Sequence, residues 1–206
     1  MLWRKAWIES RGRFLFGIAA TGTACAYGWY ANRVTNSGVP RMTFIACCFL
    51  VGMGGLLREG AVGTAPFTLA LPVSRLRLVA ARAAVGWLEL VALALPASLF
   101  TPSPLESWLL WVAGGSSLFA FAFLASCVLA GEYTPFVASW IAFFAHTTTT
   151  QYVRLMRPAL RPYLFTLQEI MSRLRPFSPA LAVTALAAGS CALLATAALV
   201  TKRRDF

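Results

Sequence analysis

Residues 58–75 read REGAVGTAPFTLALPVSR and separate two long apolar runs of the chain. The segment contains glycine and proline, which interrupt helices, and both of its edges are charged. Residues 40–57 before it and residues 78–100 after it are mostly apolar. This contrast predicts a compact polar loop at residues 58–77, between two helices that are buried in an apolar environment.

The overall composition favours a membrane protein. Hydrophobic residues make up 59% of the 206 residues and charged residues only 12%, whereas about 25% of the residues in a soluble domain are charged. A bilayer core about 30 Å thick requires about 20 apolar residues for each helical span, and several runs in this chain reach or approach that length. We therefore expect an all-α integral membrane protein that forms one transmembrane domain over residues 1–206.

Six apolar segments predict six transmembrane helices. In chain order they occupy residues 14–31, 40–57, 78–100, 108–130, 134–150 and 180–200. Residues 151–179 are too polar to span a membrane, yet apolar side chains recur on one helical face of this segment. We expect it to form a short amphipathic or re-entrant helix on the outer side, where it either seals the bundle or acts as a gate or a site for anionic headgroups.

The first 13 residues predict an amphipathic helix. At about 100° per residue, Trp3, Trp7 and Ser10 share one face, while Lys5 and Glu9 lie on another. Such a helix lies in the membrane interface with its tryptophans at headgroup depth. It is either a simple topology anchor or a separate elbow helix in front of the first span.

The positions of the basic residues predict the orientation. Cytoplasmic segments carry an excess of Lys and Arg, and eleven of the 18 basic residues lie on the side that holds both termini and the 58–77 loop. We therefore expect a multi-pass protein of the plasma (inner) membrane with cytoplasmic termini. Span ends facing anionic lipids account for the net charge of +11. Membrane lipids are thus expected partners, and nucleic acid is not, because no nucleic-acid-binding motif is present.

Three segments together resemble the type 2 ABC transporter permease family. In that family a Glu follows the second span, then a Gly-Thr step, then a short leucine-rich helix ending in Leu-Pro-Val-Ser-Arg. The corresponding positions here are Glu59, Gly63, Thr64 and residues 71–75. The opening WRKAWIESRGRF and the closing RDF are also similar to the ends of such permeases. The resemblance extends over nearly the whole chain.

This resemblance implies the transmembrane permease subunit of an ATP-driven ABC exporter. It implies separate ABC ATPase subunits, which bind ATP and magnesium, and a second permease copy or a paralogue. The 58–77 loop would be the coupling element between permease and ATPase. The residues expected to contact the ATPase subunit are Glu59, Phe67, Leu69, Leu71, Pro72 and Arg75.

The sequence contains no catalytic or cofactor motif of its own. It lacks Gly-x-x-x-x-Gly-Lys-Ser/Thr, the loop that cradles nucleotide phosphates, so we expect a non-catalytic subunit without a cofactor. Its five cysteines lie in apolar runs without a Cys-x-x-Cys pair, and buried cysteines of this kind act as small hydrophobic residues. No metal site is expected.

Glu89 and His146 are the candidates for a translocation path. Glu89 lies within a predicted span, where an acidic residue costs about 3 kcal/mol on insertion, and Arg82 lies two turns earlier on the same helical face. Glu89 is either a structural carboxyl, protonated or paired inside the bundle, or a contact for cargo or a cation. His146 is either a packing residue or a proton or ligand site.

The near absence of other charges in the spans favours a hydrophobic or amphipathic cargo such as a lipid, drug or peptide. Two other functions remain open. A membrane anchor or mechanotransmission subunit of an ATPase complex would share the loop but move no cargo. A stand-alone channel or carrier would need intramembrane charges, and Glu89 is the one available. Small residues around Gly52 and Gly115 predict close helix contacts, either within the chain or with another subunit.

Overall fold

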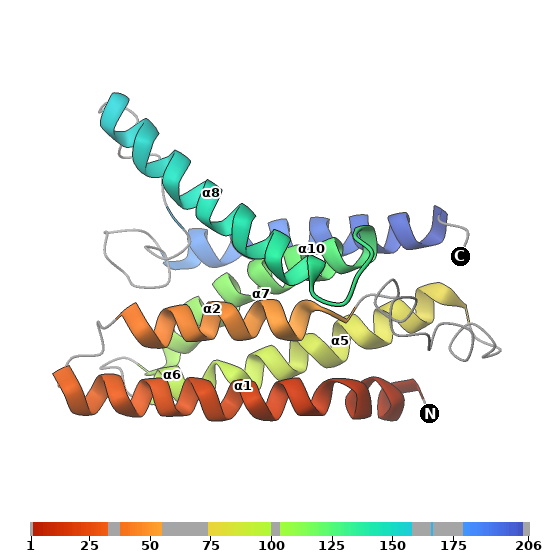
Figure 1. Ribbon diagram of the computed structural model, residues 1–206, viewed down its shortest axis with the longest axis horizontal. Coiled ribbons are helices and arrows are strands. Elements are labelled where there is room, and N and C mark those ends of the chain that lie inside the picture. Colours follow the sequence, from red (N-terminus) through yellow and green to blue (C-terminus); the bar gives the residue numbers. More distant parts are fainter. Residues whose placement is uncertain are drawn as a thin grey trace.

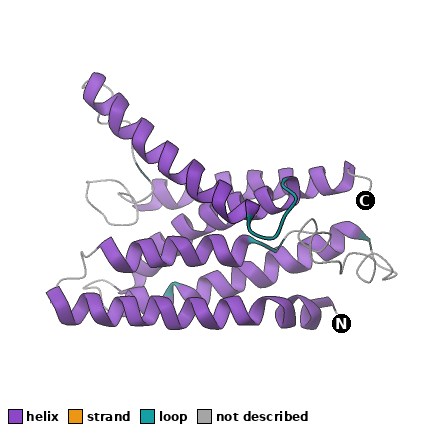
Figure 2. Cartoon of the chain, viewed as in Figure 1, coloured by secondary structure: helices purple, strands orange, loops and turns teal. Residues whose placement is uncertain are grey.

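The computed structural model describes residues 2–32, 38–54, 74–99, 104–157, 166 and 179–203. Within this part of the chain the secondary structure is helical and contains no strand (Figure 2). The six long helices are α1 (Leu2–Asn32), α2 (Gly38–Gly52), α5 (Arg75–Leu93), α7 (Pro104–Val128), α8 (Thr134–Met156) and α10 (Pro179–Arg203). A five-residue helix, α6 (Leu95–Leu99), lies between α5 and α7. The all-α fold is therefore confirmed.

The long helices run back and forth between two ends of the molecule (Figure 1). Helices α1, α2, α5, α7 and α10 pack together, whereas α8 diverges from the others along its length. At one end α1 begins, α2 ends, α5 begins and α10 ends, so both ends of the chain lie on this side. We call it the loop end, because the segment that connects α2 to α5 starts and finishes there.

Two of the six long helices could cross a membrane by length and composition. They are the segments Leu105–Val128 of α7 and Val183–Arg203 of α10, and α2 adds a shorter apolar helix at Val39–Gly52. The prediction of six long helices is confirmed at the expected positions, but six membrane spans are not confirmed. The remaining helices are less apolar, because α1 and α5 contain charged residues and α8 contains four consecutive threonines.

The prediction of a separate elbow helix over residues 1–13 is wrong. Helix α1 is continuous from Leu2 to Asn32 and therefore includes both the amphipathic segment and the first predicted span. No proline interrupts its sequence, so every helical hydrogen bond has a donor across the expected junction. Ala6 and Ser10 in the amphipathic segment are buried, so this segment packs against the bundle instead of lying apart from it.

Two other predicted boundaries also move. The third predicted span divides into α5 and α6, because Pro96 has no N–H for the helical hydrogen bond to Ala92. The fifth extends beyond residue 150, since α8 continues to Met156. Most of the predicted outer helix at residues 151–179 lies outside the described residues.

Aromatic side chains and close glycine contacts build the core between α2 and α7. Phe44, Phe49, Phe119 and Phe123 are at most 1% exposed. A Cβ added to Gly52 would lie 2.7 Å from Ala122 Cβ and 2.9 Å from Phe119 O. At Gly115 it would meet the Phe44 ring at 2.9 Å. These two glycines therefore serve helix packing within the chain.

Replacing Gly52 with alanine should destabilise the bundle. The methyl group would meet backbone and Cβ atoms that cannot rotate away, and overpacking of this kind costs about 1–3 kcal/mol. Thermal unfolding of the purified protein in detergent should show the loss as a lower Tm. The matched control is Gly22→Ala in α1, where nothing lies within 4 Å of the added Cβ. Equal Tm values for the two variants would contradict the close packing of α2 on α7.

Candidate functional site

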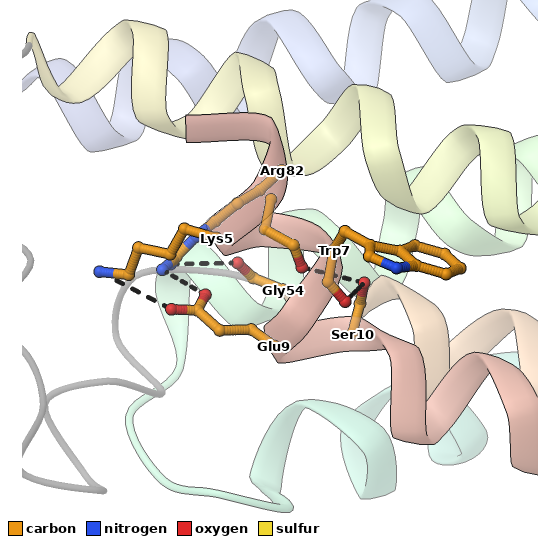
Figure 3. A network of polar contacts seen from close by, with 7 residues as sticks. Lys5, Trp7, Glu9, Ser10, Gly54 and Arg82 are labelled. Carbon is orange, nitrogen blue, oxygen red and sulfur yellow. Dashed lines mark hydrogen bonds and ion pairs between the residues drawn. The ribbon is translucent and has the colours of Figure 1, made fainter. Parts of the chain in front are cut away.

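A cluster of polar side chains joins α1 to α5 at the loop end (Figure 3). The Arg82 Nη2 atom donates to Glu9 Oε2 at 2.9 Å, and the Ser10 hydroxyl donates to Glu89 Oε1. Glu9 and Ser10 are consecutive on α1, while Arg82 and Glu89 are two turns apart on α5. Two consecutive residues of α1 thus bind α5 at two positions that are two helical turns apart.

The ion pair is buried at its cationic end and open at its anionic end. The Arg82 side chain is 6% exposed and that of Glu9 is 38% exposed. Lys5 Nζ approaches the other carboxylate oxygen of Glu9 at 3.7 Å. A buried guanidinium that loses its carboxylate keeps a large desolvation penalty. Glu9 therefore stabilises the position of Arg82, and through it the first half of α5.

Side-chain hydrogen bonds flank the segment at residues 55–73 on both sides. Arg13 Nη1 on α1 donates to Leu50 O near the end of α2 at 3.0 Å. Arg82 Nη1 reaches Gly54 O, just before the segment, at 3.5 Å. After the segment, the Ser74 hydroxyl caps α5 by accepting from Arg77 N at 3.4 Å. The residues just before this segment are thus connected to α1 and α5 as well as to α2.

The buried Glu89 carboxyl can keep its contact with Ser10 in either charge state. It is 2% exposed, Arg13 interacts with it electrostatically, and Oε2 has no hydrogen-bond partner among the described residues. The Ser10 hydroxyl also lies 3.0 Å from Ala6 O. Because a hydroxyl has one proton, Ser10 can donate to a Glu89 carboxylate, or donate to Ala6 O while accepting from a protonated Glu89.

Of the predicted site residues, the structure describes Glu89, His146 and Arg75. Glu89 faces α1, whereas His146 is exposed on α8, so the two do not meet. Of the predicted contacts to the ATPase, Arg75 is half-buried at the start of α5. The other five lie outside the described residues: Glu59, Phe67, Leu69, Leu71 and Pro72.

Sequence reasoning identified Arg82 and Glu89 but missed their partners on α1. Arg82 pairs with Glu9 and Glu89 pairs with Ser10, although Arg82 and Glu89 lie two turns apart on the same face of α5. One usable signal was Ser10, a lone hydroxyl on the apolar face of the first helix. A polar group on a packing face needs a hydrogen-bond partner.

A second feature is an apolar groove between α5, α7 and α10. Its volume is about 710 Å³. The wall from α5 includes Ala80, Ala84 and Trp87, and the wall from α10 includes Ala187 and Leu194. Its remaining lining residues come from α5, α7 and α10, and none of the residues that line it is charged.

Removing the Ser10 hydroxyl should destabilise the contact between α1 and α5. Ser10→Ala leaves a buried Glu89 carboxyl without its donor, which costs about 1–3 kcal/mol. The double variant Ser10→Ala with Glu89→Leu should recover most of that loss, because replacing both partners by apolar groups is close to neutral. Glu89→Gln should remain near wild type, since its amide can still pair with Ser10.

Thermal unfolding in detergent measures these effects as a double-mutant cycle. Thr196→Ala is the matched control, because the Thr196 hydroxyl is exposed and donates within its own helix to Ala192 O at 2.8 Å. Additive losses from Ser10→Ala and Glu89→Leu would show that the two side chains are not coupled.

Comparison with known proteins does not identify a family for this chain. No family model, curated protein or solved structure matches it. The resemblance to type 2 permeases therefore rests on the sequence motifs alone.

Proposed function

We propose that this chain is the transmembrane permease subunit of an ATP-driven ABC transporter and that separate ATPase subunits drive it. The observation that supports the proposal most is the attachment of the segment between α2 and α5. Arg13 donates to the carbonyl of Leu50 near the end of α2, and Arg82 donates to that of Gly54 just before the segment. A coupling loop needs such rigid attachment, because a loop that moves freely transmits no force.

In this proposal the ATPase subunits bind ATP and magnesium and close on each other. Their movement displaces the loop, with Phe67, Leu69 and Leu71 as the apolar anchors and Glu59, Pro72 and Arg75 around them. Helices α2 and α5 follow the loop directly. Helix α1 follows through the pairs Arg82–Glu9 and Ser10–Glu89. The loop end and both termini are then cytoplasmic, in the plasma membrane.

The packing of the bundle favours transport between two permease copies. The core between α2 and α7 is filled by Phe44, Phe49, Phe119 and Phe123, each at most 1% exposed. Cargo therefore does not pass between these two helices in this conformation. Passage between this chain and a second copy or a paralogue avoids the filled core. The apolar walls of the groove favour a hydrophobic or amphipathic cargo.

The same filled core favours one alternative function. A membrane anchor that transmits conformational change for an ATPase complex needs the loop and its attachment but no cargo path. The carrier or channel alternative has less support, because Glu89 is hydrogen-bonded to Ser10 and is only 2% exposed. Cargo-dependent ATP hydrolysis separates a transporter from an anchor, since an anchor would not respond to cargo.

The combined substitution of Phe67, Leu69 and Leu71 by alanine should abolish docking of the ATPase. Each apolar anchor of an interface contributes about 1–3 kcal/mol, and the loss of three exceeds what a transient complex tolerates. Two quantities are measured: co-purification of the ATPase and ATP hydrolysis by the complex. The chain alone should hydrolyse no ATP.

The matched control removes one Phe and two Leu side chains elsewhere. Leu15, Phe16 and Leu88 are all exposed, by 61%, 63% and 54%, and their combined change to alanine should leave docking intact. Unchanged docking and hydrolysis in the loop variant would remove the loop from the coupling role. Loss of both in the control would point to damage of the whole bundle instead.

A further inference from the structure

The polar atoms in the walls of the apolar groove are already hydrogen-bonded. Trp87 Nε1 donates to Ser116 Oγ at 3.0 Å, and Ser116 donates to Val112 O at 2.7 Å. Ser190 donates to Leu186 O at 2.7 Å. These groups offer little to a polar ligand. The body of the groove therefore suits hydrocarbon, and its volume of about 710 Å³ falls within the range of roughly 300–1,000 Å³ for ligand sites.

Two basic residues stand where the groove reaches the loop end. Lys202 follows Ala198, the last groove residue of α10, by four positions, and Arg77 precedes Ala80 of α5 by three. Residues three or four apart lie on adjoining parts of one helix face. Both basic residues are exposed, and α5 begins at the end where α10 finishes (Figure 1). The groove is thus apolar along its length and positively charged at one mouth.

We propose that the groove binds an anionic phospholipid from the leaflet that meets the loop end. The acyl chains lie against the alanine-rich walls of α5 and α10, and the phosphate lies between Arg77 and Lys202. The long stems of such side chains follow apolar surface while their charged ends reach the headgroup level. The charge at the mouth selects an acidic headgroup over a neutral one. This inference requires membrane insertion but not the coupling to an ATPase.

Native mass spectrometry of the purified full-length chain in a neutral detergent tests the inference. Phosphatidylglycerol and phosphatidylcholine with identical acyl chains are titrated separately. We expect phosphatidylglycerol to bind about 10–30 times more tightly, the scale set by two basic residues near a membrane surface. The variant Arg77→Gln with Lys202→Gln should lose this preference while still binding both lipids weakly.

Two further variants separate the headgroup contact from the chain contact. Arg4→Gln with Arg11→Gln removes the same charge from exposed positions of α1, which does not line the groove, and should keep the preference. Ala187→Trp fills the groove and should weaken binding of both lipids. Equal loss of preference in the two charge variants would overturn the proposal, as would unchanged binding in Ala187→Trp. A dimer that Ala187→Trp disrupts, without any lipid preference, would assign the groove to a second copy.

Discussion

The burial of Arg82 inside a largely apolar bundle is the constraint on which the loop end depends. A guanidinium removed from water needs a carboxylate and hydrogen-bond acceptors nearby. Arg82 obtains the carboxylate from Glu9 at 2.9 Å and reaches the Gly54 carbonyl at 3.5 Å. One side chain of α5 thus contacts both α1 and the residue that follows α2. The relative positions of three helices are linked through a single cation.

Ser10 and Glu89 extend this link by two turns of α5. Their contact is deeper than the ion pair, since Glu89 is 2% exposed and Ser10 is 7% exposed. Because the Ser10 hydroxyl can donate either to Glu89 or to Ala6 O, it can remain paired when the carboxyl gains or loses a proton. The contact between α1 and α5 is therefore compatible with both charge states.

The sequence predicted the helices better than it predicted their partners. Long apolar runs located all six long helices, because apolar periodicity and length are local properties. The continuity of α1 was missed because a change from amphipathic to apolar sequence was interpreted as the end of one helix and the start of another. No proline ends the helix at this position. The pairing of Glu9 with Arg82 joins residues 73 positions apart, and such contacts depend on how the helices pack. The coupling residues 59–72 lie outside the described part of the chain, so their role remains a prediction.

The loop end combines two kinds of chemistry. Toward α1 and α2 it carries the ion pair and hydrogen bonds that hold the loop segment. Toward α10 it carries the exposed cations Arg77 and Lys202 beside an apolar groove. Arg77 also donates its backbone N–H to the Ser74 hydroxyl. The first turn of α5 therefore lies beside the loop segment and also beside the mouth of the groove. A lipid headgroup there would contact the helix that follows the proposed coupling loop.

The most direct test concerns the side of the membrane that the loop end faces. Single cysteines at Ala65, in the loop, and at Ala159, after α8, are introduced once the five native cysteines have been replaced. Intact cells are then treated with a maleimide that does not cross membranes. We expect labelling of Ala159→Cys in intact cells and labelling of Ala65→Cys only after the membrane is permeabilised. Labelling of Ala65→Cys in intact cells, with Ala159→Cys protected, would contradict a cytoplasmic loop and any coupling to an ATPase through it.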